Sequence, residues 1–420
     1  MHDFLNEILA TISRNRLRTA LTGAAVVWGI FILIVLLGAG NGLINALTDN
    51  SSRFLSNSII VYGGTTSEPY EGLSKGRTIS LNDRDMRITR DAFPAHVDQV
   101  GAEIDHSGAT LRHGTNYTTG INLSGVYPNE TSINKRTIIH GRFINDADMQ
   151  ERRKVIVIND DMARELSPQS VSQLVGRHIS ADSIAFLVVG IYERDKSMMG
   201  SDAFVPFTTF RSVFSSGDKV GNITFTFHGL KTEEENLAFD AQYRAHINTA
   251  HNASPTDVNA IWIWNRLRQN LQMSTAIEIV RTALWVIGIL TLLSGIVGVS
   301  NIMLITVKER TREFGIRKAI GASPWSILRL ILAESVAITT FFGYIGMVLG
   351  IAANLYMDAT IGQTTLDMGF TSMRMFLNPT VGLGTCVKAT LLMVAAGTLA
   401  GLIPARRAAR IRPIEALRAE

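Results

Sequence analysis

Four long stretches without a charged side chain constrain this sequence more than any other feature. A helix needs about 20 apolar residues to cross the hydrocarbon core of a bilayer, because each residue advances it by about 1.5 Å. The stretches cover residues 19–48, 282–307, 335–357 and 381–405, the last interrupted only by Lys388. Charged residues make up only 18% of the chain, against about 25% in soluble globular proteins. We therefore predict an α-helical membrane protein with four transmembrane helices.

These stretches divide the chain into nine segments. We expect a cytoplasmic amphipathic helix over residues 1–18 and transmembrane helices over 19–42, 282–307, 330–357 and 381–405. A large mixed α/β extracytoplasmic domain with stalk helices, residues 43–281, is inserted between helices 1 and 2. The remaining segments are a cytoplasmic loop (308–329), a short external loop (358–380) and a cytoplasmic tail (406–420).

The distribution of Lys and Arg predicts the orientation. Three basic residues precede the first span, six lie in the 308–329 loop and five follow residue 405, against one, Arg374, in the 358–380 loop. Basic residues accumulate on the cytoplasmic side of a membrane, so both termini and the 308–329 loop should be cytoplasmic. The segment 41–281 has 24 basic and 27 acidic residues, so the net charge of +4 belongs to the cytoplasmic flanks and matches an anionic inner leaflet. It gives no reason to expect a nucleic-acid partner.

The N-terminal residues predict a surface helix followed by an uncleaved span. Phe4, Leu5, Ile8, Leu9 and Ile12 recur at helical spacing, as in a helix lying on a membrane; the alternative is a plain extension of the first span. Basic residues before an apolar stretch are also typical of a secretory signal peptide. The stretch is, however, longer than the roughly 7–15 apolar residues of such a signal.

The external segment predicts strands between two stalk helices. Helix-like sequence follows the first span (GLINALTDNSSRFL) and precedes the second (NRLRQNLQMSTAIEIVRTAL). Between them, the short runs 58–62, 117–127, 154–158, 186–191 and 222–227 are rich in β-branched and aromatic residues and are separated by turn residues. Residues 159–166 predict a short helix. About 200 residues suffice for a separate core.

The sequence contains no pattern that indicates catalysis or metal binding. It has no GxxxxGK[ST], HExxH or GxSxG. The single cysteine, Cys386, excludes an intramolecular disulfide, and no Cys/His spacing fits zinc. We therefore expect no enzyme activity, cofactor or metal in this chain.

Few polar residues interrupt the spans. Lys388 lies about 10 Å from the outer end of the fourth span, where snorkelling or packing between helices is favoured over a proton pathway. Glu334, at the inner end of the third span, allows the same interpretations: snorkelling, packing between helices or a proton pathway. Two GxxxG pairs allow close approach of helices, within the chain or between subunits: Gly346 with Gly350, and Gly397 with Gly401.

The run SNIMLITVKERTREFGIRKAIGAS, Ser300 to Ser323, joins the second span to the cytoplasmic loop. Its apolar residues Phe314, Ile316 and Ile320 could pack, while its basic residues would face polar partners. On composition alone, a basic loop beside a membrane often does no more than set the orientation. A docking role would therefore need further support.

That run resembles the FtsX-like permease domain of MacB-type ABC transporters, which has an NIMLxxVxERTREIGIRxAxGA form. The tail PARRAARIRPIEALRAE and the N-terminal RNRLRTALT are similar to the same family, and FLSNSIIVYGG, GRFIND, KVIVIND and FLVVGIYE are similar to its periplasmic core. The resemblance implies that the 308–329 loop couples to an ATPase through the following residues: Lys308, Glu309, Arg310, Arg312, Glu313, Phe314, Gly315, Arg317 and Lys318.

The resemblance also implies partners and a function. Its prototype carries a fused ATPase domain, whereas this sequence has no P-loop, so we expect ATP to be bound by a separate ABC ATPase subunit. The permease would form a homodimer or heterodimer in the bacterial inner membrane, with a periplasmic adaptor and an outer-membrane channel, and would export a periplasmic substrate. The alternatives are a signalling permease that controls a cell-wall hydrolase or sensor kinase, and a lipoprotein-releasing permease.

Overall fold

The computed structural model describes residues 16–52, 54–195, 202–214, 216–362, 365–367, 372–374 and 376–410. The chain forms two compact units. The helical unit comprises Met1–Thr48, Ala276–Leu366 and Arg374–Glu420, and the sheet unit comprises Asp49–Thr275 and Asp367–Met373. Most of the amphipathic helix expected over residues 1–18 and most of the tail 406–420 lie outside the described residues.

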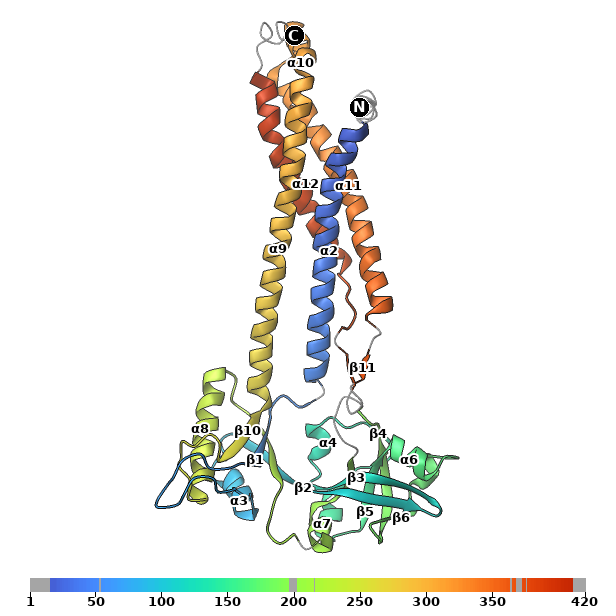
Figure 1. The fold of residues 1–420 in the computed structure, drawn as a ribbon, viewed down its shortest axis with the longest axis vertical. Helices are drawn as coiled ribbons and strands as arrows, with labels where there is room; N and C mark the ends of the chain where they lie inside the picture. The colour runs from blue at the N-terminus through green and yellow to red at the C-terminus, as the bar shows by residue number, and fades with distance from the viewer. Residues whose placement is uncertain are drawn as a thin grey trace. The chain divides into compact units, whose positions relative to one another are not determined.

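Four long helices make up most of the helical unit (Figure 1). They are α2 (Arg16–Ser52), α9 (Arg266–Glu309), α11 (Pro324–Thr360) and α12 (Leu383–Arg410), and a short helix, α10 (Thr311–Ala319), lies between α9 and α11 in the chain. Each long helix contains a window that is long and apolar enough to cross a membrane. The four predicted spans are therefore confirmed as helices.

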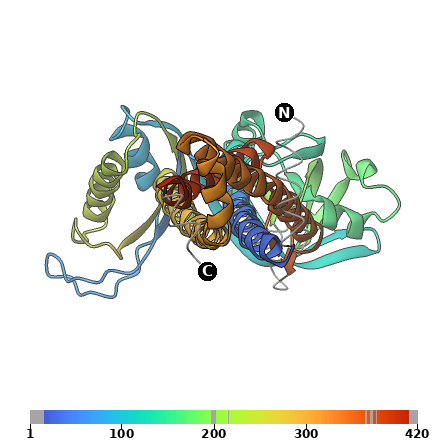
Figure 2. The ribbon, with the colours of Figure 1, turned by 90° about the horizontal axis from the view of Figure 1, so that it is seen from above.

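The core of the helical unit gathers side chains from all five helices. Ile30 and Ile34 of α2, Met303 of α9, Phe314 of α10 and Met393 of α12 are among its buried members, together with Ile327 and Ile331 of α11. Seen from above (Figure 2), the long helices appear nearly end-on and gather into one group. Phe314 thus places the short helix α10 on the same core as the spans.

The sheet unit is built on one ten-stranded mixed sheet, ordered β10-β1-β9-β2-β3-β8-β5-β7-β4, with β6 paired to β2 and β7. The strands are β1 (Ser58–Gly63), β2 (Val97–His113), β3 (Asn116–Val126), β4 (Ile138–Gly141), β5 (Val155–Asn159), β6 (His178–Ala181), β7 (Ile184–Tyr192), β8 (Asp202–Pro206), β9 (Asn222–Phe227) and β10 (Ile261–Asn265). The β3/β8 and β5/β7 pairs are parallel.

Six helices accompany this sheet. They are α3 (Asp83–Asp91), α4 (Glu130–Ile133), α5 (Asp146–Gln150), α6 (Asp160–Leu166), α7 (Phe207–Phe214) and α8 (Glu233–Ala250), and a 3-10 turn covers Ser172–Leu174. Two buried clusters result, one beneath α3 and α8 and one beneath α6. A mixed α/β domain with its own core is therefore confirmed.

All five predicted strand runs are strands, and β9 has the predicted limits. The short helix predicted over 159–166 is α6, whose N-cap is Asn159: its side chain accepts a hydrogen bond from the Met162 amide at 2.8 Å. The prediction missed β2, β4, β6, β8 and β10. The longest of these, β2, contains bulges that break the alternation of its side chains. The external loop 358–380 also contains two short strands, β11 (Thr365–Asp367) and β12 (Ser372–Arg374).

The two predicted stalks are continuous with the spans. Helix α9 begins at Arg266, sixteen residues before the uncharged stretch at 282, and α2 continues to Ser52. Strand β10 ends at Asn265 and α9 begins at the next residue. An edge strand of the sheet is thus joined to a membrane helix without a linker.

Candidate functional site

The short helix α10 and its two junctions contain all nine residues that the resemblance implies for ATPase coupling. Helix α9 ends at Glu309, and α10 begins after Arg310. A Schellman turn ends α10: the Gly321 amide donates to Lys318 O at 3.0 Å and the Ala322 amide to Arg317 O at 2.9 Å. Gly321 has φ +102°, a conformation that favours glycine over other residues.

Arg310 lies at the centre of an ion-pair network. Its Nε and Nη2 donate to the two carboxylate oxygens of Glu313, at 2.9 and 3.1 Å, and its Nη1 donates to Glu334 Oε2 at 3.4 Å. Arg317 also donates to Glu313, at 2.9 Å. The hydrogen bond from Arg310 holds the pKa of the Glu313 carboxyl below its ordinary value. The network joins α10 to the buried Glu334 of α11.

The apolar residues of α10 do not all pack as expected. Phe314 is fully buried beneath the Arg310 guanidinium, which lies 5.2 Å from the ring centre. Ile316 and Ile320 are 43% and 82% exposed, and Trp325, at the start of α11, is 64% exposed. Gly315 is buried, whereas Lys308, Glu309 and Arg312 are exposed and Lys318 is half-buried. Of the three apolar residues that could pack, Phe314 does so within the chain, whereas Ile316 and Ile320 do not. Arg310 faces polar groups, the carboxylates of Glu313 and Glu334.

Both glycine pairs lie against other helices of the same chain. A Cβ atom on Gly346 would come within 2.7 Å of the Val27 carbonyl oxygen, and one on Gly350 within 2.8 Å of Ile34 Cβ, both in α2. Gly397 and Gly401 lie against Thr339 and Ser335 of α11 in the same manner. These glycines therefore allow close packing of α2, α11 and α12 within one subunit.

Two further polar side chains, which the sequence did not single out, also join the spans. Ser335 Oγ donates to Gly397 O at 3.1 Å, and Asn354 Nδ2 donates to Ile34 O at 2.9 Å. Polar residues in apolar helices commonly bond across helices, so their position inside an uncharged stretch was an available signal. Lys388 is exposed on the outside of the helical unit, which agrees with snorkelling.

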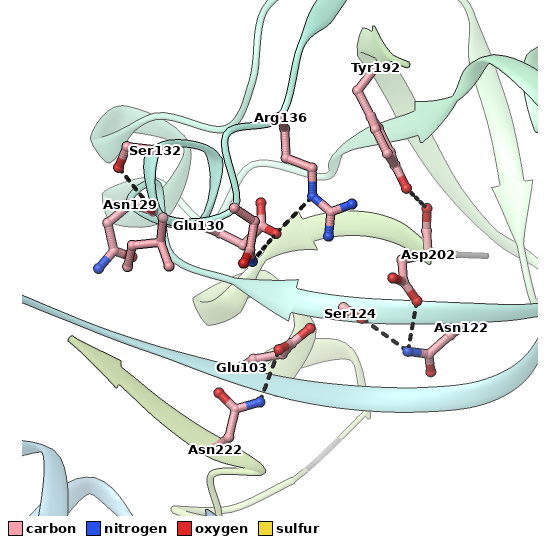
Figure 3. A network of polar contacts seen from close by, with 12 residues as sticks. Glu103, Asn122, Ser124, Asn129, Glu130, Ser132, Arg136, Tyr192, Asp202 and Asn222 are labelled. Carbon is pink, nitrogen blue, oxygen red and sulfur yellow. Dashed lines mark hydrogen bonds and ion pairs between the residues drawn. The ribbon is translucent and has the colours of Figure 1, made fainter. Parts of the chain in front are cut away.

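The sheet unit contains a separate network of buried charged groups around α4 (Figure 3). Glu130 Oε1 accepts hydrogen bonds from Arg136 Nε at 3.0 Å and from Asn134 Nδ2 at 2.9 Å. Arg136 lies over the rings of Tyr192 and Phe204, at 5.3 and 5.0 Å from the ring centres. The network connects α4 to strands β7 and β8.

Acidic groups of the neighbouring strands extend this network. Asp202 accepts a hydrogen bond from Asn122 at 3.1 Å, and Glu103 accepts one from Asn222 at 2.9 Å (Figure 3). Burial raises the pKa of Asp202 above its ordinary value, and burial together with the nearby Asp105 raises the pKa of Glu103 to about 8. None of these residues was singled out from the sequence, because the strands that bring them together are far apart in the chain.

In the described parts of the chain, no group of three or more His, Cys, Asp or Glu side chains is placed to hold a metal ion. The geometry of α10 and of the α4 network instead provides firm attachment of helices to their surroundings.

Comparisons with known proteins agree with this description. Residues 19–239 match the model of the MacB-like periplasmic core domain, and residues 285–413 match that of the FtsX-like permease C-terminal domain. "Macrolide export ATP-binding/permease protein MacB" of Shewanella sp. (strain W3-18-1) is 28% identical over 98% of this chain, and the protein of the same name from Marinobacter nauticus is 29% identical over 99%. The chain spans 60% of the length of each of these relatives.

Among solved structures, the periplasmic region of MacB from Actinobacillus actinomycetemcomitans is 14% identical, with a TM-score of 0.43, over 54% of this chain and 97% of that one. The family models together cover both the domain between the first two spans and the last three spans, and they confirm the resemblance found in the sequence. This chain therefore belongs to the family of ABC transporter permeases that combine a MacB-like periplasmic core domain with an FtsX-like permease domain.

Proposed function

We propose that this permease couples ATP hydrolysis by a separate ATPase subunit to movement of its periplasmic domain, and that this movement drives export of a periplasmic substrate. The observation that favours this function most is the two-sided character of α10. Its inner face is fixed to the spans through Phe314 and Arg310, while Ile316 and Ile320 point outward. In this proposal the chain itself hydrolyses no ATP and binds no cofactor.

The exposed side of α10, the residue that follows it and the start of α11 have the chemistry of a docking surface. Ile316, Ile320 and Trp325 are large apolar residues left exposed at one end of the helical unit, with the exposed Arg312 nearby in the sequence. An apolar centre with a charged rim is the usual composition of a protein interface. A partner that covers this surface would move α10, and α10 is held to α11 through Arg310 and Glu334.

The continuity of α9 supports movement over a distance. One helix of 44 residues runs from the edge strand β10 to the junction with α10. A packed helix moves as a rigid element, so α9 would transmit a displacement of α10 to the sheet. In the described spans, Glu334 is paired with Arg310 and Lys388 is exposed, which favours transmission of motion over a polar channel.

The remaining expectations complete the proposal. Fourteen basic residues in the N-terminal flank, the 308–329 loop and the tail, against one in the 358–380 loop, favour an inner-membrane protein with both termini in the cytoplasm. We propose a homodimer or a heterodimer with a second permease, assisted by a periplasmic adaptor and an outer-membrane channel. The names of the relatives, which describe macrolide export, support export over signalling or lipoprotein release.

The docking surface provides the test. A tagged chain is purified from its bacterial host in detergent, and co-purified proteins with a P-loop are identified by mass spectrometry. Ile320→Glu should lose the ATPase subunit, because a charge would be buried in the contact. Leu237→Glu, at a residue 47% exposed on α8 of the sheet unit, is the matched control and should retain it. Retention of the ATPase by the Ile320 variant would contradict the docking surface.

The same preparation tests the division of labour. The chain without its partner should hydrolyse no ATP, and the combined replacement of Arg312, Glu313 and Arg317 by Ala should uncouple ATP hydrolysis from transport or release the ATPase. A fully active triple variant with the ATPase still bound would show that α10 is not the coupling element.

A further inference from the structure

Arg266 occupies an unusual position at the base of α9. It is the first residue of this helix, directly after the edge strand β10, and only 6% of it is exposed. A buried charged group is costly unless its donors are satisfied. The contacts of this guanidinium therefore need an explanation.

The guanidinium contacts two separate segments of the sheet unit, residues 54–58 and residues 133–134. Nη1 donates to Ser58 Oγ of β1 and to the Ile133 carbonyl of α4, both at 3.3 Å. Nη2 donates to Asn134 Oδ1 at 2.9 Å. On another side, the ring of Phe54 lies 4.2 Å from the guanidinium carbon, a cation–π contact.

The Ile133 carbonyl also accepts a hydrogen bond from the segment that follows α2, the other stalk helix. The Leu55 amide donates to it at 2.8 Å, and Leu55 lies three residues after the end of α2 at Ser52. One carbonyl of α4 thus accepts a hydrogen bond from the chain that leaves α2 and another from the first residue of α9. The segment that follows α2 and the first residue of α9 are therefore both hydrogen-bonded to the Ile133 carbonyl, and we call this shared attachment the fastening.

The fastening extends across the sheet. Asn134, which accepts a hydrogen bond from Arg266, donates one in turn to Glu130. Glu130 binds Arg136 (Figure 3). Arg136 lies over Tyr192 of β7 and Phe204 of β8, on the far side of β2 and β3 from β1. A chain of contacts therefore leads from the two helix roots to the distant half of the sheet.

The acceptors of Arg266 differ from those of an ordinary ion pair. They are a hydroxyl, a carbonyl and an amide oxygen, all neutral. Arg268, two residues further along α9, instead binds the Asp240 carboxylate of α8 at 3.0 Å. For stability alone, an apolar residue often serves as well as a buried charge, whereas the planar fork of arginine can join several segments at once.

We propose that Arg266 is a positioning residue that fastens the roots of α2 and α9 to α4, so that movement of these helices reaches both halves of the sheet. The proposal makes two claims. That Arg266 attaches the helix roots to α4, the fastening, concerns the sheet unit alone. That this attachment transmits movement to the sheet rests on the proposed function.

Hydrogen exchange of the full chain in detergent tests the fastening. In Arg266→Met, the Leu55 amide should exchange roughly 10–100-fold faster, because loss of a charged hydrogen-bond donor loosens α4 and its Ile133 carbonyl. Arg268→Met, which removes an ion pair from the same helix, is the matched control and should leave Leu55 unchanged. Arg266→Lys keeps the charge without the fork and should restore part of the protection. Protection of Leu55 equal to that of the wild type in both Arg266 variants would overturn the fastening.

Spin labels test the transmission in the complex with the ATPase. In a Cys386→Ser background, labels are placed at the exposed Ile279 of α9 and Ile139 of β4, and their distance is measured with and without ATP and vanadate. We expect ATP to change the distance in the parent and in Arg268→Met, and the change to be lost in Arg266→Met while ATP hydrolysis continues. An undiminished change in Arg266→Met would overturn the transmission. If the chain has no ATPase partner, both the proposed function and the transmission of movement are refuted. The hydrogen-exchange experiment needs no ATPase and still tests the fastening.

Discussion

Replacing Glu103 with glutamine should flatten the pH dependence of the stability of the sheet unit. Glu103 lies on β2, accepts a hydrogen bond from Asn222 of β9, and has a pKa raised from 4.5 to about 8 by burial and by the charge of Asp105. Between these two pH values the folded chain holds a proton on Glu103 that the unfolded chain has released. Stability therefore falls as the pH rises through this window, and the loss is complete above about pH 8.

The size of the effect follows from the same pKa difference. At about 1.4 kcal/mol per pKa unit, the change from 4.5 to about 8 corresponds to at most about 5 kcal/mol. Glu103 is only half-buried and Asp105 is exposed, so solvent screens part of this energy, and we expect about 1–2 kcal/mol. The amide oxygen introduced by Glu103→Gln can still accept the hydrogen bond from Asn222. The variant should therefore be more stable than the wild type at pH 8 and equally stable near pH 4.5.

The assay is urea unfolding of the full chain in detergent at several pH values between 4.5 and 8.5. It is followed by tryptophan fluorescence in a background where Trp28, Trp285 and Trp325 are replaced by Phe, so that the signal comes from Trp262 and Trp264 on β10. Only the difference between variant and wild type is compared, because other groups titrate equally in both. Glu165→Gln, at an exposed position of α6, is the matched control and should follow the wild type. Parallel stability curves for wild type and the Glu103 variant across this range would refute the reasoning.

Three further predictions concern the helical unit and its orientation. Gly350→Leu should lower the melting temperature of the detergent-purified chain, because a side chain there meets Ile34 of α2. Gly384→Ala should leave it unchanged, because no atom lies within 4 Å of a Cβ added there. Equal melting temperatures of the two variants would contradict the close packing. Phe314→Ala should destabilise the helical unit by about 3–5 kcal/mol through the cavity it leaves, measured by thermal unfolding, and a loss below about 1 kcal/mol would mean that α10 is not held by this ring. Alkaline phosphatase fused at Asn129 should be active and fused after Gly321 inactive, and activity at both sites would remove the predicted topology.

The sequence by itself determined the membrane helices and the general character of the domain between the first two. A bilayer demands only length and the absence of charge from a helix, and both are read directly along the chain, as in 282–307. Local signals also sufficed for α6, where Asn159 caps the first turn, and for β9, where β-branched and aromatic residues alternate. The string of α10 was enough to predict its family.

Only the tertiary structure decided which residues meet. The polar partner of Arg310 proved to be Glu334 of α11, and Ile320, which could have packed, is exposed. Arg266 contacts Ser58, 208 residues earlier, and Ile133, 133 residues earlier. Local composition predicts whether a residue suits a helix, a strand or a membrane, because those preferences depend on near neighbours. The partner of a side chain depends on how distant segments pack, and on this point a single sequence contains no direct signal.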